Sequence, residues 1–304
     1  MTHANSLLNS SSDYRARDAA ITCQSYSLVR KLEGISYELF ELYWRDVHGP
    51  LCARLPGLGF YVQHHFSRER RTNLWPAIPD VRRIDISLDG AVEIGFPNIV
   101  DQNRFFDASS ILFSEETHLF GWDNAYSLPQ GSHTYVDRQA DGIPNGPDKL
   151  HRLHLYLNGK PGTEFHAWAI AFAEHLASAA AVQKLRLHLP EAYDNGRPQP
   201  PSPGVDHYVI DDMLHPAVME IGFENALAAN LFFASDDFQA AVAGQSRHIQ
   251  AMAVFLVAGV YTYIRDSTPT TAGLRGSRTA EIIGVMGAAN QTYSEVTSLF
   301  YNKR

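Results

Sequence analysis

The chain has 304 residues, of which 45% are hydrophobic and 19% charged, a balance typical of a globular protein with one large domain or two small ones. A formal charge of -8 and a pI near 5.9 give no overall positive field, so we expect no nucleic-acid partner and no membrane-surface partner. The sequence shows no long apolar run, no secretory leader and no CxxC pair, so we expect a cytoplasmic protein without a membrane span or a structural zinc site.

The first half predicts one mixed unit of strands and helices. Residues 1–21 are polar, and we expect them to be flexible. The unit itself covers residues 22–138. Its predicted elements are a strand at 26–31, a helix at 36–54, strands at 60–66 and 91–96, a helix from 100, and a strand at 134–137.

A linker rich in Gly, Pro and Asp is predicted at residues 139–150, and a second unit follows at 151–266. Leu153, Leu155 and Leu157 alternate with polar residues, which indicates a half-buried strand. The other predicted elements are a helix at 163–181, strands at 185–189 and around residue 220, a helix from 226, and a strand at 260–264. Residues 267–304 are predicted to form a C-terminal helical extension.

The two units repeat one another. AVEIGFPN at residues 91–98 matches VMEIGFEN at residues 218–225, and His48 falls on His175 at the same offset. Both halves have the order βαββαβ, which is the ferredoxin-like unit. We therefore predict an α+β fold with two ferredoxin-like repeats in tandem.

The segment LFELYWRDVHGPLCARLPGLGFYVQHH, residues 39–65, carries a resemblance to a known family. It resembles the EthD domain family of the dimeric α/β-barrel superfamily in its Trp44, His48, Pro56-Gly57 and Tyr61. The second half resembles that family through the repeat alone, because it keeps His175 but has Ala171 in place of the Trp. The resemblance implies that two sheets pack face to face into a barrel within one chain, as a monomer or a homodimer.

One face of each predicted sheet is apolar and should meet the helices, so the opposite face should line the barrel. In the second unit that face carries polar groups, and burying them favours a pocket over a packed core. The predicted lining residues are Arg152, His154, Tyr156, Arg186, His188 and Glu220 in the second unit, and Ser25, Ser27, Tyr61, Gln63, His65 and Glu93 in the first.

Within this lining we expect His154 and His188 to act as an acid and base pair, with Glu220 orienting one imidazole. His48 is a further catalytic candidate, with a structural role at a helix C-terminus as the equal alternative. Trp44 is either a substrate contact or a residue that packs helix against sheet. The expected substrate-binding residues are Tyr61, Gln63, His65, Glu93, Tyr156, Arg186 and Trp44.

Similar barrels include decarboxylases, cyclases, dehydratases and cofactor-free monooxygenases, and among the activities that the resemblance implies we favour a lyase that acts on an aromatic or phenolic small molecule. We expect neither a cofactor nor a metal, since no P-loop, GxGxxG, GxSxG or HExxH motif occurs. The residues of HRLH at 151–154 point to opposite faces of a strand, which disfavours metal binding there. The alternatives are a haem-dependent oxidoreductase or dehydratase, and a non-catalytic accessory protein that binds a small molecule.

Overall fold

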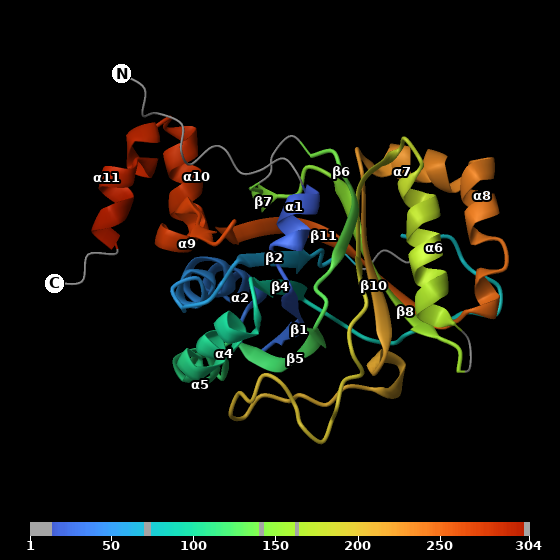
Figure 1. The fold of residues 1–304 in the computed structure, drawn as a ribbon, viewed down its shortest axis with the longest axis horizontal. Coiled ribbons are helices and arrows are strands. Elements are labelled where there is room, and N and C mark those ends of the chain that lie inside the picture. The colour runs from blue at the N-terminus through green and yellow to red at the C-terminus, as the bar shows by residue number, and fades with distance from the viewer. Residues whose placement is uncertain (1–13, 70–73, 140–142, 162–163, 301–304) are drawn as a thin grey trace.

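Antiparallel strands form the centre of the molecule, and helices cover them (Figure 1). The computed structural model describes residues 14–69, 74–139, 143–161 and 164–300. The strands are β1 (Cys23–Lys31), β2 (Phe60–Phe66), β3 (Arg82–Arg83), β4 (Gly90–Phe96), β5 (Phe120–Leu128), β6 (His133–Asp137), β7 (Asn145–Pro147), β8 (His151–Gly159), β9 (Val182–His188), β10 (Pro216–Phe223), β11 (Ile249–Arg265) and β12 (Thr268–Pro269).

The helices are α1 (Tyr14–Ala19), α2 (Tyr37–Tyr43), α3 (Gly49–Cys52), α4 (Ile99–Ala108), α5 (Ser110–Glu116), α6 (Phe165–Ala177), α7 (Ala226–Phe233), α8 (Asp236–Val242), α9 (Thr271–Arg275), α10 (Ser277–Val285) and α11 (Ser294–Thr297). A π-helical turn, Trp44–His48, joins α2 to α3. Short 3-10 turns lie at Asp211–Met213, Gln245–Arg247, Ala289–Thr292 and Ser298–Phe300.

The strands form two sheets of identical internal order. The first sheet runs β5-β1-β4-β2, and the second runs β11-β8-β10-β9. Each sheet places the fourth strand of its repeat beside the first strand and the third strand beside the second, which is the ferredoxin-like arrangement. The predicted α+β fold with tandem ferredoxin-like repeats is confirmed.

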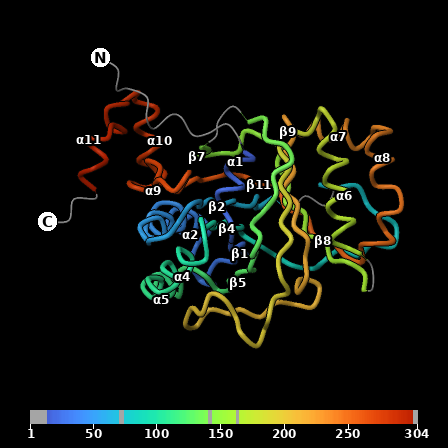
Figure 2. Tube along the Cα trace, in the orientation of Figure 1, coloured from blue at the N-terminus to red at the C-terminus, as the bar shows by residue number. Residues whose placement is uncertain are grey.

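The C-terminal part of each repeat also pairs with the other sheet. The first part of β11 pairs with β8, and its second part pairs with β2. In the same way β5 pairs with β1, while β6, which follows it, pairs with β9 (Figure 2). β5 was not predicted, because Asp123 and Asn124 interrupt its apolar pattern. The strand predicted at 134–137 was assigned to the wrong sheet, since β6 pairs with β9 of the second repeat.

Helices α6, α7 and α8 cover the outer face of the second sheet (Figure 1). Leu153, Leu155 and Leu157 pack there with Ala169 and Phe172 of α6. Burying aliphatic side chains of this size contributes about 1.5–3 kcal/mol each. The prediction that the leucine face of the second sheet packs against helices is confirmed.

The predicted facing of the first sheet was wrong for most of its residues. Tyr61 packs in the core between this sheet and the helices, whereas Val62 and Phe66 belong to the core between the two sheets. Gln63 and His65 share the face of Tyr61, so His64 points into the barrel instead. β2 is buried on both faces, so its sequence shows no polar and apolar alternation from which its facing could be read.

The regions outside the two repeats also differ from expectation. Residues 1–21 were expected to be flexible, but Tyr14–Ala19 forms α1, and Asp18 of this helix accepts a hydrogen bond of 2.6 Å from the backbone of Thr134. Residues 1–13 lie outside the described ranges. The predicted linker contributes β7 to the sheet beside β11. Across the described residues, no helix combines the length and apolarity that a membrane crossing requires.

Candidate functional site

The segment around His48 owes its geometry to the π-helical turn. Ser36 caps α2 by accepting a hydrogen bond from the backbone of Leu39. The wider turn at Trp44–His48 then buries both Trp44 and His48 against the sheet. In the second repeat α6 continues without such a turn, and the equivalent Ala171 and His175 are exposed.

Side chains from the neighbouring sheet stabilise this turn. The Tyr263 hydroxyl donates to the Arg45 carbonyl at 2.8 Å, and Gln63 Nε2 donates to the Trp44 carbonyl at 3.3 Å. A Cβ on Gly49 would lie 2.3 Å from the Tyr263 ring, so only glycine fits there. The position that directly follows the turn is therefore restricted to glycine.

Trp44 packs rather than faces a cavity. Its ring stacks on His65 with centroids 4.1 Å apart and is fully buried. Among the residues that line the two cavities described below, Trp44, Gln63 and His65 do not occur. The packing alternative for Trp44 accounts for its position.

A pocket lies between the first sheet and helices α4 and α5. Figure 1 shows these two helices beside β5. Its empty space, open mouth included, is about 580 Å³. Most of the wall is aromatic or aliphatic, from Val29, Tyr61, Val92, Ile94, Phe96, Phe105, Phe106, Leu112, Phe113 and Phe120. An aromatic and aliphatic lining of this kind is typical of small-molecule sites.

A few polar side chains converge on this pocket, which we call the helix-side pocket. His48 lines it, and its Nδ1 donates to Glu115 Oε2 at 2.7 Å. Such a bond fixes the ring orientation and leaves Nε2 as the free acceptor. Burial alone would raise the pKa of Glu115, but the hydrogen bond from His48 lowers it below its ordinary value.

Two further carboxyl groups line the helix-side pocket, Glu116 and Asp123. Burial raises the pKa of Asp123 well above its usual range, and the nearby Glu116 raises it further. Burial also raises the pKa of Glu116, which accepts a hydrogen bond from Ser202. The pocket thus combines a carboxylate-held histidine with carboxyl groups that favour the protonated form.

A second polar group of residues lies in the barrel interior. Glu93 accepts hydrogen bonds from Gln24 at 2.8 Å and from Arg186 at 3.0 Å. Arg152 donates to Glu220 at 2.5 Å. Tyr26 bonds both His154 Nδ1, at 2.9 Å, and the Tyr156 hydroxyl, at 2.8 Å. The bonds that Arg186 and Tyr26 make run between the two sheets and hold the barrel together, whereas the other two lie within one sheet.

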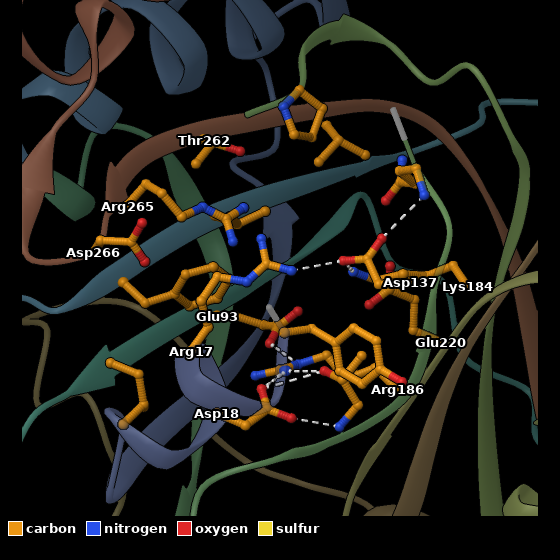
Figure 3. A pocket seen from close by; sticks show the side chains of 18 of the residues that line it. Arg17, Asp18, Glu93, Asp137, Lys184, Arg186, Glu220, Thr262, Arg265 and Asp266 are labelled. Carbon is orange, nitrogen blue, oxygen red and sulfur yellow. Dashed lines mark hydrogen bonds and ion pairs between the residues drawn. The ribbon is translucent and has the colours of Figure 1, made fainter. Parts of the chain in front are cut away.

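A cavity at one end of the barrel reaches this interior group (Figure 3). Arg17 and Asp18 of α1 form part of its wall, and Figure 3 shows Arg186 between Asp18 and Glu93. The lining is strongly charged and includes Asp137, Arg152, Lys184, Glu220 and Arg265. We call this the barrel-end cavity.

The structure brings together part of the predicted site. His154, His188, Glu220, Glu93, Arg186 and Tyr156 meet in the barrel interior, as predicted. His48 and Tyr61 instead line the helix-side pocket. Sequence reasoning missed Tyr26, His64, Glu115, Glu116 and Asp123, and only a correct assignment of β5 could have indicated Asp123.

Comparisons with known proteins bear on the fold of the chain. Residues 32–111 match the EthD domain family. A suspected monooxygenase from Fusobacterium nucleatum superposes with a TM-score of 0.52 at 7% identity, over 83% of this chain and 98% of that one. This likeness shows a shared fold that spans both repeats.

Two further solved structures resemble the chain more loosely. A suspected monooxygenase from Lactobacillus acidophilus gives a TM-score of 0.44 at 10% identity, covering 82% of this chain and 97% of that one. An anthrone oxidase-like protein gives a TM-score of 0.48 at 12% identity, covering 80% of this chain and 94% of that one. The comparison with curated proteins gave no match.

Proposed function

We propose that this chain, which carries an EthD domain at residues 32–111 within a dimeric α/β-barrel fold, is an enzyme that moves protons on an aromatic small molecule in the helix-side pocket. The observation that carries the proposal is the His48–Glu115 pair at the wall of a phenylalanine-lined pocket that also contains Asp123. The proposal moves the acid and base chemistry from the barrel interior, where the sequence predicted it, to the outer side of the first sheet.

In the proposed reaction His48 is the base. Its Nε2 takes a proton from a carbon or hydroxyl group of the substrate, and Glu115 stabilises the imidazolium that forms. The protonated carboxyl of Asp123 then gives its proton to the substrate oxygen or to the leaving group. If the electron pair of the broken C–H bond forms a new double bond, and the leaving group departs with the electron pair of its own bond and takes the proton of Asp123, the reaction is an elimination and the enzyme a lyase.

The apolar wall supports an aromatic or phenolic substrate. Flat rings pack well against phenylalanine edges and faces, and the pocket excludes water that would compete for the proton. Two hydroxyl groups, those of Ser25 and Ser27, lie in the same wall and can bind a substrate oxygen.

A haem does not fit this pocket well. His48 with its carboxylate partner has the arrangement of an axial ligand. However, the lining of the helix-side pocket contains Glu116 and Asp123 and neither Lys nor Arg, so haem propionates would face carboxyl groups. The barrel-end cavity has cations, but its wall is charged rather than apolar. We therefore propose a reaction without haem.

Blocking the pocket tests where the ligand binds. Ala125 lines the helix-side pocket, and Ser127, two residues along the same strand and on the same face, is exposed outside it. We expect Ala125→Phe to weaken binding of 1-naphthol, measured by fluorescence titration, by at least about tenfold, the loss of about 1.4 kcal/mol. Ser127→Phe is the matched control. Equal affinity in both variants would place the ligand elsewhere.

Turnover, measured beside the same titration, separates an enzyme from an accessory binding protein. We expect His48→Gln to keep the affinity for 1-naphthol within a few-fold, because a base contributes mainly to the transition state. If no substrate from a phenolic panel is turned over faster by the native chain than by His48→Gln, the accessory-protein alternative holds.

A further inference from the structure

A second group of potential ligands lies outside the helix-side pocket, in the barrel interior. One donor atom each from His64, His154 and Glu220 lie within 4.8 Å of one another, and Glu93, His188 and Glu220 form a second such set. These five side chains come from five strands of the two sheets, β2, β8, β10, β4 and β9. All are at most 2% exposed, so solvent does not satisfy them.

Each histidine in this group uses one ring nitrogen and leaves the other without a partner. His64 bonds Glu93 through Nε2 at 3.1 Å, His154 bonds Tyr26 through Nδ1 at 2.9 Å, and His188 bonds Ser132 through Nδ1 at 2.7 Å. Within the described residues, His64 Nδ1, His154 Nε2 and His188 Nε2 have no hydrogen-bond partner. Buried polar atoms without partners cost free energy, so three such histidines in one cluster of side chains indicate a bound species.

The engaged nitrogens resemble the outer contacts of metal sites. A metal-binding histidine usually bonds a carboxylate or another polar group through its second nitrogen, which fixes the ring. Glu93 serves His64 in this way, and the Tyr26 hydroxyl serves His154.

The charges in the group also suit a cation. His154 and His188 are fully buried, and burial favours the neutral imidazole, which is the form that binds metals. The Arg152 guanidinium beside Glu220 favours the ionised form of that carboxyl group. Glu220 therefore offers a carboxylate, with Oε1 bonded to Arg152.

We propose that His64, His154 and Glu220 bind one divalent transition-metal ion, with His188 and Glu93 completing its surroundings. Two imidazoles with one carboxylate suit Zn²⁺, Co²⁺ or Fe²⁺ rather than Mg²⁺ or Ca²⁺, which prefer oxygen ligands. The proposal goes beyond the reaction proposed for the helix-side pocket and does not depend on it.

The site has a route to solvent and needs side-chain movements of about an ångström. His64, Glu93 and Glu220 all line the barrel-end cavity, through which an ion can enter. Two bonds of about 2.1 Å at a tetrahedral angle span about 3.4 Å, so donors up to 4.8 Å apart must close by as much as about 1.4 Å, which side-chain rotation can supply.

Metal titration of the untagged, full-length chain tests the proposal. After chelator treatment and dialysis, we expect Co²⁺ to bind at about one equivalent with a visible absorption band, and Zn²⁺ to displace it. His64→Gln and His154→Gln should each weaken the affinity at least about 100-fold, in line with losses seen when metal surroundings are altered.

His65→Gln is the matched control, because His65 is the adjacent residue of the same strand, is equally buried and faces the helices. We expect its Co²⁺ affinity to equal that of the native chain, and circular dichroism to show each variant folded. Less than a tenth of an equivalent bound by the native chain would overturn the proposal and leave a buried water as the occupant. Equal affinity in the native chain, His64→Gln and His154→Gln would overturn it as well.

Discussion

At the residue scale, the proposed proton removal by His48 depends on the carboxylate of Glu115. The carboxylate fixes the ring and stabilises the imidazolium, so its charge matters as well as its hydrogen bond. We expect Glu115→Gln to lower kcat at least about tenfold and to change KM little, since the effect falls on the transition state. Steady-state kinetics on a substrate found in the phenolic panel measure both constants. A rise in KM at constant kcat would show that Glu115 acts in binding instead.

Asp123 makes a prediction about stability and pH. Its pKa is raised in the folded protein by burial, so the carboxyl contributes stability below its unfolded pKa near 3.8, and that stability is lost as the pH rises toward the folded value. Asparagine does not ionise, so Asp123→Asn should not lose this stability as the pH rises. We therefore expect the difference in melting temperature, variant minus native chain, to increase from pH 5 to pH 8. A constant difference across that range would show that Asp123 is not protonated in the fold.

At the element scale, the π-helical turn buries His48 at the wall of the helix-side pocket. Tyr263 donates to the Arg45 carbonyl of that turn from the neighbouring strand. Tyr263→Phe leaves a carbonyl of the turn without this donor, and we expect a loss of about 1–3 kcal/mol in the free energy of unfolding. Chemical denaturation measures it, with exposed Tyr208→Phe as the control. Equal stability of the two variants would show that the turn does not need this bond.

The sequence predicted the elements better than their facing. The repeat and the leucine alternation of β8 and β9 indicated the second sheet correctly, because one face there meets helices and the other is polar. β2 carries no such contrast, so Tyr61, Gln63 and His65 were placed on the wrong face. The π-helical turn has no sequence signature, and the pairing of His48 with Glu115 joins segments that only the fold brings together.

At the scale of the whole molecule, buried polar contacts join the two repeats. Arg186 of β9 bonds Glu93 of β4 in the opposite sheet, and also Asp18 of α1. Arg186→Met would leave the buried Glu93 and the half-buried Asp18 without this partner, and we expect a loss of about 3–5 kcal/mol. Arg104→Met, which removes an exposed ion pair with Asp101, should cost at most about 1 kcal/mol. Similar losses in both variants, measured by denaturation, would contradict a structural role for the interior pair.

The central claim is that His48 removes protons from an aromatic compound in the helix-side pocket, and hydrogen exchange tests it without knowledge of the natural reaction. We would measure deuterium incorporation from D₂O into 1-tetralone, a fused-ring ketone with acidic C–H bonds, by mass spectrometry. The native chain should accelerate exchange, His48→Gln should reduce that acceleration about 10²–10⁴-fold, and His175→Gln, which alters the exposed equivalent in the second repeat, should not. Exchange no faster than in buffer, or equally fast in His48→Gln, would contradict the account.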